Sequence, residues 1–234
     1  MAIPKIIHYC WFGGNPLPRS AEKCIESWKK YCPDYEIIEW NENNFDMNMN
    51  PYTKKWYEEK KYAFVSDYAR LLIIEQHGGF YFDTDVEVVR PIDALRNHSA
   101  FIGFENNSFV NTGQGFGAQA HNPAVKAMLE EYVQLLDGTG ETIGCPILNT
   151  NALVKLGMRL DGNYQELTDI TVYPVEYFNP YDAPAGLLVT TDLTYSIHWY
   201  AKSWMKKSVI IRSWLMRPIH RIKRRMKDRK GNVK

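Results

Sequence analysis

The chain has 234 residues, of which 45% are hydrophobic and 14% aromatic, enough for one domain with a substantial core. Its net charge is only +1, but residues 202–234 hold 13 Lys and Arg with one acidic residue, whereas residues 1–201 hold 15 basic and 26 acidic residues. No stretch offers the ~20 consecutive apolar residues of a membrane-spanning helix, and the amino terminus lacks the basic region and apolar run of a secretory signal.

The four cysteines form no Cys-x-x-Cys pair, so a zinc site is not expected. Three of them fall in segments with helix or strand patterns, where buried free thiols are common. We therefore expect a reducing, cytoplasmic environment.

The first segments alternate between strand and helix. Residues 5–10 are rich in Ile and Tyr and predict a strand, residues 20–31 predict a helix with Ser20 as its N-cap, and residues 36–40 predict a second strand. This βαβ order predicts an α/β fold with a mainly parallel sheet.

The later segments continue the alternation. Residues 106–119 are rich in Asn, Gln and Gly and predict a binding loop around a short strand near residues 115–118. The remaining expected elements are helices at 53–61, 63–77, 123–136 and 145–156, and strands or extended segments at 79–82, 86–89, 100–105, 172–177 and 189–195.

Two aspartates follow the apolar, aromatic strand at residues 79–82. Asp83 and Asp85 stand where that strand should leave the core, and ligands of open α/β sheets gather at the carboxyl ends of strands. Two carboxylates at this spacing can share Mg²⁺ or Mn²⁺, whose other ligands are phosphate oxygens and water. The alternative is a polar turn after an edge strand.

A second charged pair lies in the helix that leads into this strand. Asp67 and Arg70 are three residues apart and therefore share a helix face. On an exposed helix such a pair contributes little to stability. This helix has a mostly apolar pattern, however, so we expect the pair to be buried and to bind a partner such as sugar hydroxyls.

Three further residues are candidates on weaker grounds. Trp11 follows the first strand and precedes Gly13-Gly14, so its indole can offer a flat face to a nucleobase, although a core Trp beside a loop fits as well. His198 can supply a third metal ligand or a structural hydrogen bond. Trp204 can simply belong to the core.

The basic tail has apolar residues at helical spacing, namely Ile211, Leu215, Ile219, Ile222 and Met226. A basic amphipathic helix is typical of a membrane surface that bears anionic lipid. The alternatives are a helix that packs on the body, or disorder. The tail has no nucleic-acid-binding motif and the body is acidic, so no nucleic acid partner is expected.

Four segments together resemble glycosyltransferase family 32. They are Ile-Pro-Lys-Ile-Ile-His-Tyr-Cys-Trp-Phe-Gly-Gly at 3–14, Ser-Asp-Tyr-Ala-Arg at 66–70, Gly-Gly-Phe-Tyr-Phe-Asp-Thr-Asp at 78–85, and the pair of His198-Trp and Ser203-Trp. The same elements resemble, more distantly, the glucosyltransferase domain of the large clostridial cytotoxins. The resemblance covers about residues 3–204, and its specificity lies in the order and spacing of the four segments.

The resemblance implies a GT-A catalytic domain over residues 1–204, followed here by a basic amphipathic tail over residues 205–234. It further implies a nucleotide-sugar donor, a UDP-sugar rather than GDP-mannose, together with Mn²⁺ or Mg²⁺ and retention of the anomeric configuration. By position, Trp11 would stack on the base, and Asp67 and Arg70 would hold the donor sugar. Asp83 and Asp85 would bind ribose, diphosphate and metal.

At the carboxyl end of the resemblance, His198 matches the family's histidine and Trp204 its closing tryptophan. The cytotoxins differ from this chain around His198, so its role as a metal ligand carries over least directly. The expected activity is sugar transfer to a saccharide or lipid-linked saccharide in bacterial polysaccharide biosynthesis, on the inner face of the cell membrane.

Two other classes remain as alternatives. A phosphatase of the haloacid dehalogenase type also places Asp-x-Asp after a hydrophobic strand, with Asp83 as its nucleophile, but the late acidic motif of that family is missing. A non-catalytic, membrane-attached carbohydrate-binding protein is the other. It would not need Asp83, Asp85, Arg70 and His198 together.

Overall fold

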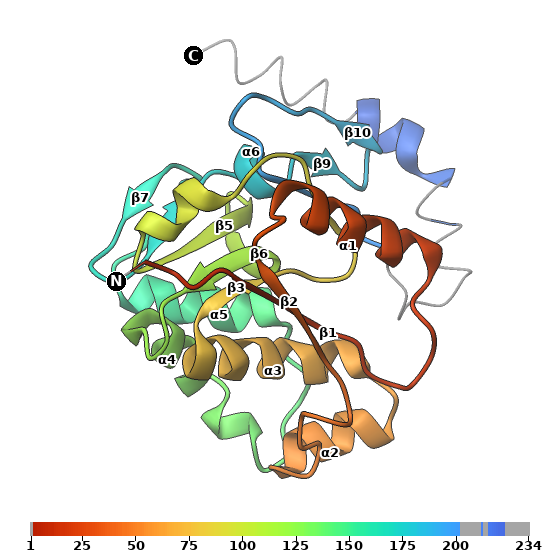
Figure 1. Ribbon diagram of the computed structural model, residues 1–234, viewed down its shortest axis with the longest axis vertical. Helices are drawn as coiled ribbons and strands as arrows, with labels where there is room; N and C mark the ends of the chain where they lie inside the picture. Colours follow the sequence, from red (N-terminus) through yellow and green to blue (C-terminus); the bar gives the residue numbers. More distant parts are fainter. Residues whose placement is uncertain (1, 202–211, 213–214, 223–234) are drawn as a thin grey trace.

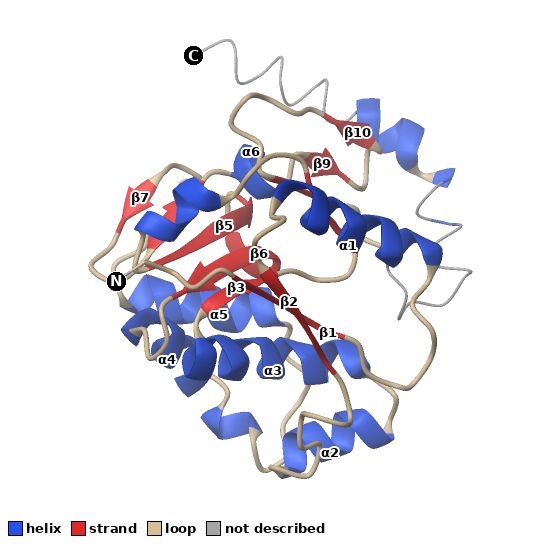
Figure 2. Cartoon of the chain, in the orientation of Figure 1, coloured by secondary structure: helices blue, strands red, loops and turns tan. Residues whose placement is uncertain are grey.

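The computed structural model describes residues 2–201, 212 and 215–222. Within them, seven strands form one mixed sheet in the order β2-β1-β3-β6-β5-β8-β7, with helices on both faces (Figures 1 and 2). The strands of this sheet are β1 (Ile6–Cys10), β2 (Glu36–Trp40), β3 (Gly79–Tyr81), β5 (Ala100–Asn106), β6 (Phe109–Ala118), β7 (Gln165–Glu166) and β8 (Thr171–Tyr173).

The strand directions make the sheet mostly parallel. β1 pairs in parallel with β2 and β3, and β5 pairs in parallel with β8. β6 runs antiparallel to both β3 and β5, so β3 and β5 point the same way, and β7 is antiparallel to β8. Five strands therefore share one direction, which confirms the predicted fold class.

Two hydrophobic clusters cover the two faces of the sheet. One cluster includes residues of α2 (Pro51–Glu58), α3 (Tyr62–His77), α4 (Pro123–Glu130) and α5 (Cys145–Lys155). The other includes residues of α1 (Arg19–Tyr31), β4 (Val86–Val88) and α6 (Val175–Phe178). Side chains along β3 alternate between them, since Phe80 belongs to the second cluster and Tyr81 to the first.

Two short ribbons lie outside the main sheet. β4 pairs antiparallel with β11 (Ser196–His198), and β9 (Tyr181–Asp182) pairs with β10 (Leu187–Leu188). Single 3₁₀ turns occupy Asp93–Asn97 and Val133–Leu135. No helix of the described residues is long and apolar enough to cross a membrane.

Several sequence-based expectations are wrong in detail. The strand expected at 172–177 gives way to the helix α6 at Val175, and the helix expected at 123–136 ends at Glu130. Ser20 lies inside α1, whose N-cap is Pro18, with no side-chain cap. The strand expected at residues 189–195 begins only at Ser196. The segment expected to be a binding loop at 106–119 contains β6, a ten-residue strand in the middle of the sheet. Its pairing with two neighbouring strands overrides the low strand propensity of its Asn and Gly residues.

The connection from α3 to β3 follows the predicted design. Gly78 ends α3 with a φ of 64°, a left-handed conformation that favours glycine, and its N–H donates to the Ile74 carbonyl oxygen. A β-carbon at Gly78 would meet the Ala120 backbone nitrogen at 2.8 Å. The chain therefore turns directly from the buried helix into the strand that leads to Asp83.

Candidate active site

The Asp-x-Asp segment leaves the sheet where the strand order branches. From β1 the chain proceeds to β2 on one side and later to β3 on the other, and ligands of open α/β sheets bind at such a switch point. β1 and β3 are adjacent and parallel, and the Phe82 N–H donates to the His8 carbonyl oxygen. Trp11 and Asp83 therefore follow neighbouring strands at the same edge of the sheet.

Asp83 is tied to α3 through a buried arginine. Arg70 Nη2 lies 2.9 Å from Asp83 Oδ1 and 3.0 Å from Asp67 Oδ1, and the Arg70 side chain is 4% exposed. Its guanidinium also lies over the Tyr81 ring, 4.8 Å from the centroid, and its Nε–H donates to the Ser66 carbonyl oxygen. One cation thus serves two carboxylates, as a buried charge requires.

The position of Asp83 depends further on β3 and β6. The Tyr81 hydroxyl donates to Asp83 Oδ1 at 3.2 Å, and the Asp83 N–H donates to the Gly113 carbonyl oxygen at 2.9 Å. A β-carbon at Gly113 would overlap Asp83 Oδ2 and crowd Arg70 Nη1. Position 113 therefore excludes any side chain while Asp83 and Arg70 keep their places.

Asp67 reaches in the other direction, to the first turn of α5. The thiol and the backbone N–H of Cys145 interact with the Asp67 carboxylate and act to lower its pKa. Gly144, the N-cap of α5, has no side-chain cap, so Asp67 supplies the negative charge that a helix amino terminus favours. Burial nevertheless raises the pKa of Asp67, against the opposing effects of Arg70 and Cys145.

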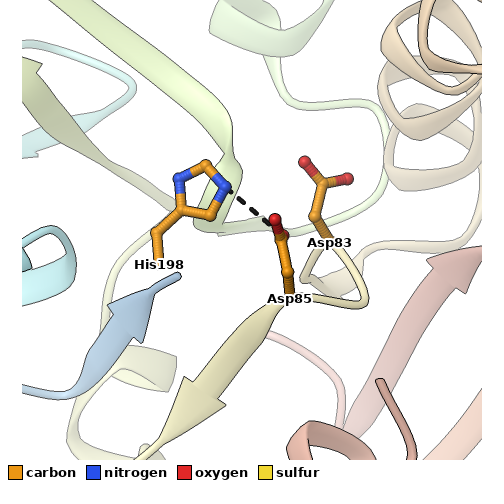
Figure 3. Close-up of side chains that lie close together, drawn as sticks. All are labelled: Asp83, Asp85 and His198. Atoms are coloured by element: carbon orange, nitrogen blue, oxygen red, sulfur yellow. Dashed lines mark ion pairs between the residues drawn. The ribbon is translucent and has the colours of Figure 1, made fainter. Parts of the chain in front are cut away.

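Asp85 meets the C-terminal part of the described body (Figure 3). In the β4–β11 ribbon, His198 is the register partner of Val86, directly after Asp85. His198 Nε2 lies 3.3 Å from Asp85 Oδ1, and the His198 side chain is only 8% exposed. The Ala201 N–H donates to Asp85 Oδ2 at 2.7 Å, and the Trp199 N–H donates to the Asp85 carbonyl oxygen at 2.9 Å.

The pKa values of His198, Asp85 and Asp83 are shifted by burial and by the charges of their neighbours. Burial lowers the pKa of His198, but the hydrogen bond and charge of Asp85 and the charge of Asp83 outweigh it, so this pKa is raised. Burial raises the pKa of Asp85, but His198 and the Ala201 N–H lower it below its usual value. For Asp83, burial raises the pKa despite Arg70.

The donor atoms of Asp83, Asp85 and His198 fit a small divalent cation. One ligand atom of each residue lies within 4.8 Å of the other two. Two carboxylates with one imidazole suit Mn²⁺, and the carboxylates alone suit Mg²⁺. A bound cation would also relieve the repulsion between the close like charges of Asp83 and Asp85, which have Arg70 and His198 beside them.

The structure thus brings together five of the seven predicted site residues: Asp67, Arg70, Asp83, Asp85 and His198. Trp11 stands on the same edge, half-buried, and its indole N–H donates to the Asn15 carbonyl oxygen at 2.6 Å. Trp204 lies outside the described residues.

Sequence reasoning missed the residues that hold this set in place: Tyr81, Gly113, Cys145 and the backbone of residues 199–201. Their contacts with the site depend on packing between distant segments. For Gly113 alone a local pattern existed, a glycine between polar residues in the Asn-rich stretch, and it was assigned to a loop.

The sequence of this chain is similar to those of known glycosyltransferases, and the similarity includes residues of this site. Residues 18–102 match the family described as the glycosyltransferase sugar-binding region containing the DXD motif. A fission yeast inositol phosphoceramide mannosyltransferase is 31% identical over 125 residues, 51% of this chain and 35% of its own length. The human α-1,4-N-acetylglucosaminyltransferase is 29% identical over 115 residues, 49% of this chain and 32% of its own length. The chain spans about a third of the length of these curated relatives.

Among solved structures, the PaToxG glycosyltransferase superposes with a TM-score of 0.55 at 21% identity, covering 66% of this chain and 69% of the other. At that identity the likeness shows the fold alone. The fold is that of GT-A glycosyltransferases. The matched residues 18–102 include Asp67, Arg70, Asp83 and Asp85. These matches confirm the resemblance inferred from the sequence.

Proposed function

We propose that the chain is a metal-dependent glycosyltransferase that moves a sugar from a nucleotide-sugar donor to a saccharide or lipid-linked saccharide. The observation that carries this proposal is that ligand atoms of Asp83, Asp85 and His198 lie within 4.8 Å of one another, beside the buried Arg70. Asp83, Asp85 and Arg70 belong to the matched region, and His198 joins them from a later segment. A carbohydrate-binding protein has no need of such a costly set of buried charges.

In this proposal Asp83, Asp85 and His198 hold the cation, which when bound neutralises the diphosphate of the donor. The Ala201 N–H holds the Asp85 carboxylate and the Trp199 N–H holds the Asp85 backbone carbonyl, so the carboxylate stays fixed as the site fills. Arg70 is a fixed positive charge, and its field favours the developing negative charge of the departing nucleoside diphosphate. Asp67 and Arg70 line the side on which the donor sugar would bind.

Trp11 gives the nucleobase a flat surface at the carboxyl end of β1. Because the Asn15 carbonyl oxygen accepts the hydrogen bond of the indole N–H, the ring is held in place before any base arrives. Retention of the anomeric configuration, and a UDP-sugar rather than GDP-mannose as donor, follow from the family resemblance and belong to the proposal.

The acceptor and the setting are proposals of the same kind. We keep the expectation of bacterial polysaccharide assembly, on a saccharide or lipid-linked acceptor at the inner membrane face. The name of one relative, an inositol phosphoceramide mannosyltransferase, is in keeping with an acceptor that carries lipid.

Attachment of the tail to anionic lipid also stays a proposal, and the described part of the tail qualifies it. Residues 217–222 are helical, with Arg217 Nη2 donating to the Tyr181 hydroxyl and Arg221 Nε donating to the Ala185 carbonyl oxygen. These two arginines face the β9–β10 ribbon, whereas Leu215 and Ile222 are 65% and 59% exposed. The apolar side chains would therefore lead the contact with lipid.

The test is a panel of nucleotide sugars that includes UDP-N-acetylglucosamine and GDP-mannose, assayed for donor hydrolysis and transfer with Mn²⁺ added or chelated. Metal-dependent release of the nucleoside diphosphate from one donor is expected. Release of inorganic phosphate from phosphomonoesters instead would favour the phosphatase alternative. Saccharide binding without turnover of any donor would favour the binding protein. The NMR coupling constant of the new glycosidic bond then tests retention.

A further inference from the structure

Tyr200 stands two residues after β11 with an unusual backbone conformation. Its φ is 51°, in the left-handed region that bulky L-residues seldom adopt. Such a conformation persists only where surrounding contacts hold it, and it is typical of functional sites. The conformation of Tyr200 therefore suggests that its contacts serve the nearby site.

The ring of Tyr200 stacks on the imidazole of His198, with centroids 4.0 Å apart and planes inclined by 29°. Its hydroxyl donates to Glu105 Oε1 at 3.1 Å and accepts from Asn179 Nδ2 at 2.6 Å. Asn179 Nδ2 also donates to the Glu105 carbonyl oxygen at 3.0 Å. Both ends of the side chain are thus fixed: the ring against His198, and the hydroxyl against β5 and the residue after α6.

The backbone on either side of Tyr200 holds Asp85. The Trp199 N–H donates to the Asp85 carbonyl oxygen, and the Ala201 N–H donates to Asp85 Oδ2. The left-handed turn at Tyr200 allows both neighbouring residues to reach the same aspartate while the ring lies over His198. One residue therefore joins two members of the three-donor cluster.

The second nitrogen of His198 points to the same role. A histidine that binds a metal usually donates its other ring N–H to a carboxylate or carbonyl, which fixes the ring orientation. His198 Nδ1 is buried and has no hydrogen-bond partner within the part of the chain that the structure describes. The orientation of this ring therefore depends on packing, and Tyr200 supplies the stacked face.

We propose that Tyr200, anchored by Glu105 and Asn179, is a positioning residue that holds His198 and the turn at 199–201 in the geometry needed to bind the cation. The inference rests on the proposed role of Asp83, Asp85 and His198 as the metal site. It adds a residue to that site that its motif does not contain, and it gives a reason for the backbone conformation at position 200.

The experiment measures Mn²⁺ binding by electron paramagnetic resonance, together with the melting temperature, for the full chain and four variants. Tyr200→Asn removes the stacked ring but suits a left-handed backbone, since Asn adopts that region readily. We expect its Mn²⁺ affinity to fall about ten- to a hundredfold, the range seen when partners of metal ligands are removed, with an unchanged or higher melting temperature. Tyr200→Phe keeps the ring but loses both hydroxyl contacts, so a smaller loss, about tenfold or less, is expected.

Two controls separate this inference from the proposed function. Tyr195→Phe removes a hydroxyl from the same segment, where the ring stacks on Phe178, and should leave Mn²⁺ affinity unchanged. Asp85→Asn should abolish binding. If Asp85→Asn abolishes binding while both Tyr200 variants bind as the wild type does, the positioning role is wrong and the metal site stands. If Asp85→Asn binds Mn²⁺ normally, the metal site itself is wrong. Should Tyr200→Asn fail to fold, wild-type affinity in Tyr200→Phe overturns the inference and weakened affinity supports it.

Discussion

Asp83 and Asp85 are separated by one residue, yet different parts of the chain hold them. Asp83 faces α3, where the permanent charge of Arg70 and the hydroxyl of Tyr81 meet its Oδ1. Asp85 faces the β4–β11 ribbon, where a titratable histidine and two backbone N–H groups meet it. The comparison indicates that Asp83 is held by side chains of the framework, meaning the buried Arg70 and Tyr81, whereas Asp85 is held by the histidine and the backbone of the β4–β11 ribbon.

The largest effect should come from breaking the framework side. Arg70→Met removes the buried guanidinium between Asp67 and Asp83 and leaves these carboxylates, 14% and 29% exposed, without that counter-charge. We expect the free energy of unfolding to fall by about 3 kcal/mol, the lower end of the range for a broken buried ion pair, together with loss of activity. Urea denaturation measures it.

Arg70→Lys is the matched control, because it keeps the charge but not the planar guanidinium that reaches two carboxylates. It should be intermediate in stability. A loss below about 1 kcal/mol for Arg70→Met, the size of an ordinary surface change, would show that Asp83 is not part of the framework.

Substitution on the other side should separate activity from stability. Asp85→Asn removes ligand charge next to His198 and should lose most metal-dependent turnover while the fold survives. Asp83→Asn should lose turnover too, but with a larger loss of stability, since Arg70 then loses one of the two carboxylates that it contacts among the described residues. Wild-type turnover of either variant at limiting Mn²⁺ would rule out the assigned site, and equal stability of the two would remove the contrast.

The pH dependence of stability should reveal a second contrast, between the buried histidines His8 and His198. Burial lowers the pKa of His8 to about 4, in contrast to the raised pKa of His198. The Trp40 indole N–H donates to His8 Nδ1 at 3.0 Å, so His8 Nε2 carries the proton and donates to the Gly78 carbonyl oxygen at 3.0 Å. The bond from Trp40 needs the neutral ring, and protonation of Nδ1 would break it, whereas the bond to Gly78 persists in the protonated ring.

The unfolded chain binds a proton at His8 near pH 6.5 and the folded chain only near pH 4. The stabilisation from neutral His8 is therefore fully present above about pH 6.5 and is lost as the pH falls towards 4, an effect of ~3 kcal/mol. Chemical denaturation at a series of pH values measures it. His8→Gln, which keeps a donor and an acceptor but does not titrate, should have a flatter profile between those values. An unchanged slope in this variant would mean that other groups cause the pH dependence.

The smallest effect should come from Trp11, which lies at the same edge of the sheet but outside the contacts of Asp83 and Asp85. Trp11→Ala should weaken binding of the nucleoside diphosphate by roughly ten- to a hundredfold, since stacking on a base contributes ~1–3 kcal/mol. Isothermal titration calorimetry measures it, with the melting temperature as the control. A large fall in melting temperature with unchanged affinity would make Trp11 a core residue.

The sequence predicted the parts of the site that lie close together along the chain. Asp67 and Arg70 share a helix face, Gly78 ends that helix, and Asp83 and Asp85 follow the strand. These relations depend on the period of a helix, the needs of a turn and the apolar pattern of a strand, all of which act locally.

Relations across distant segments were not predictable in this way. Only residues near 115–118 of β6 are expected to form a strand, because its middle, Asn111 to Gln114, is polar. Those polar residues are buried beside the site, and the strand pairs on both sides. A buried polar strand carries no apolar pattern, so periodicity misses it. The contacts of Asp85 with residues 198–201 also have no local signature, because they depend on the pairing of β11 with β4.

The β4–β11 pairing has a consequence for the order in which the chain assembles. Asp85 and Ala201 are 116 residues apart, so the loop that this contact closes is long and its closure is entropically costly. The ladders β1–β2 and β5–β6 join nearby segments and should form earlier during folding. Until Ser196–His198 adds to β4, Val86–Val88 lacks its ladder partner and exposes an apolar strand edge of the kind that recruits other chains. A fragment that stops before Ser196 should therefore aggregate, and the last step of folding should also be the step that completes the cation site.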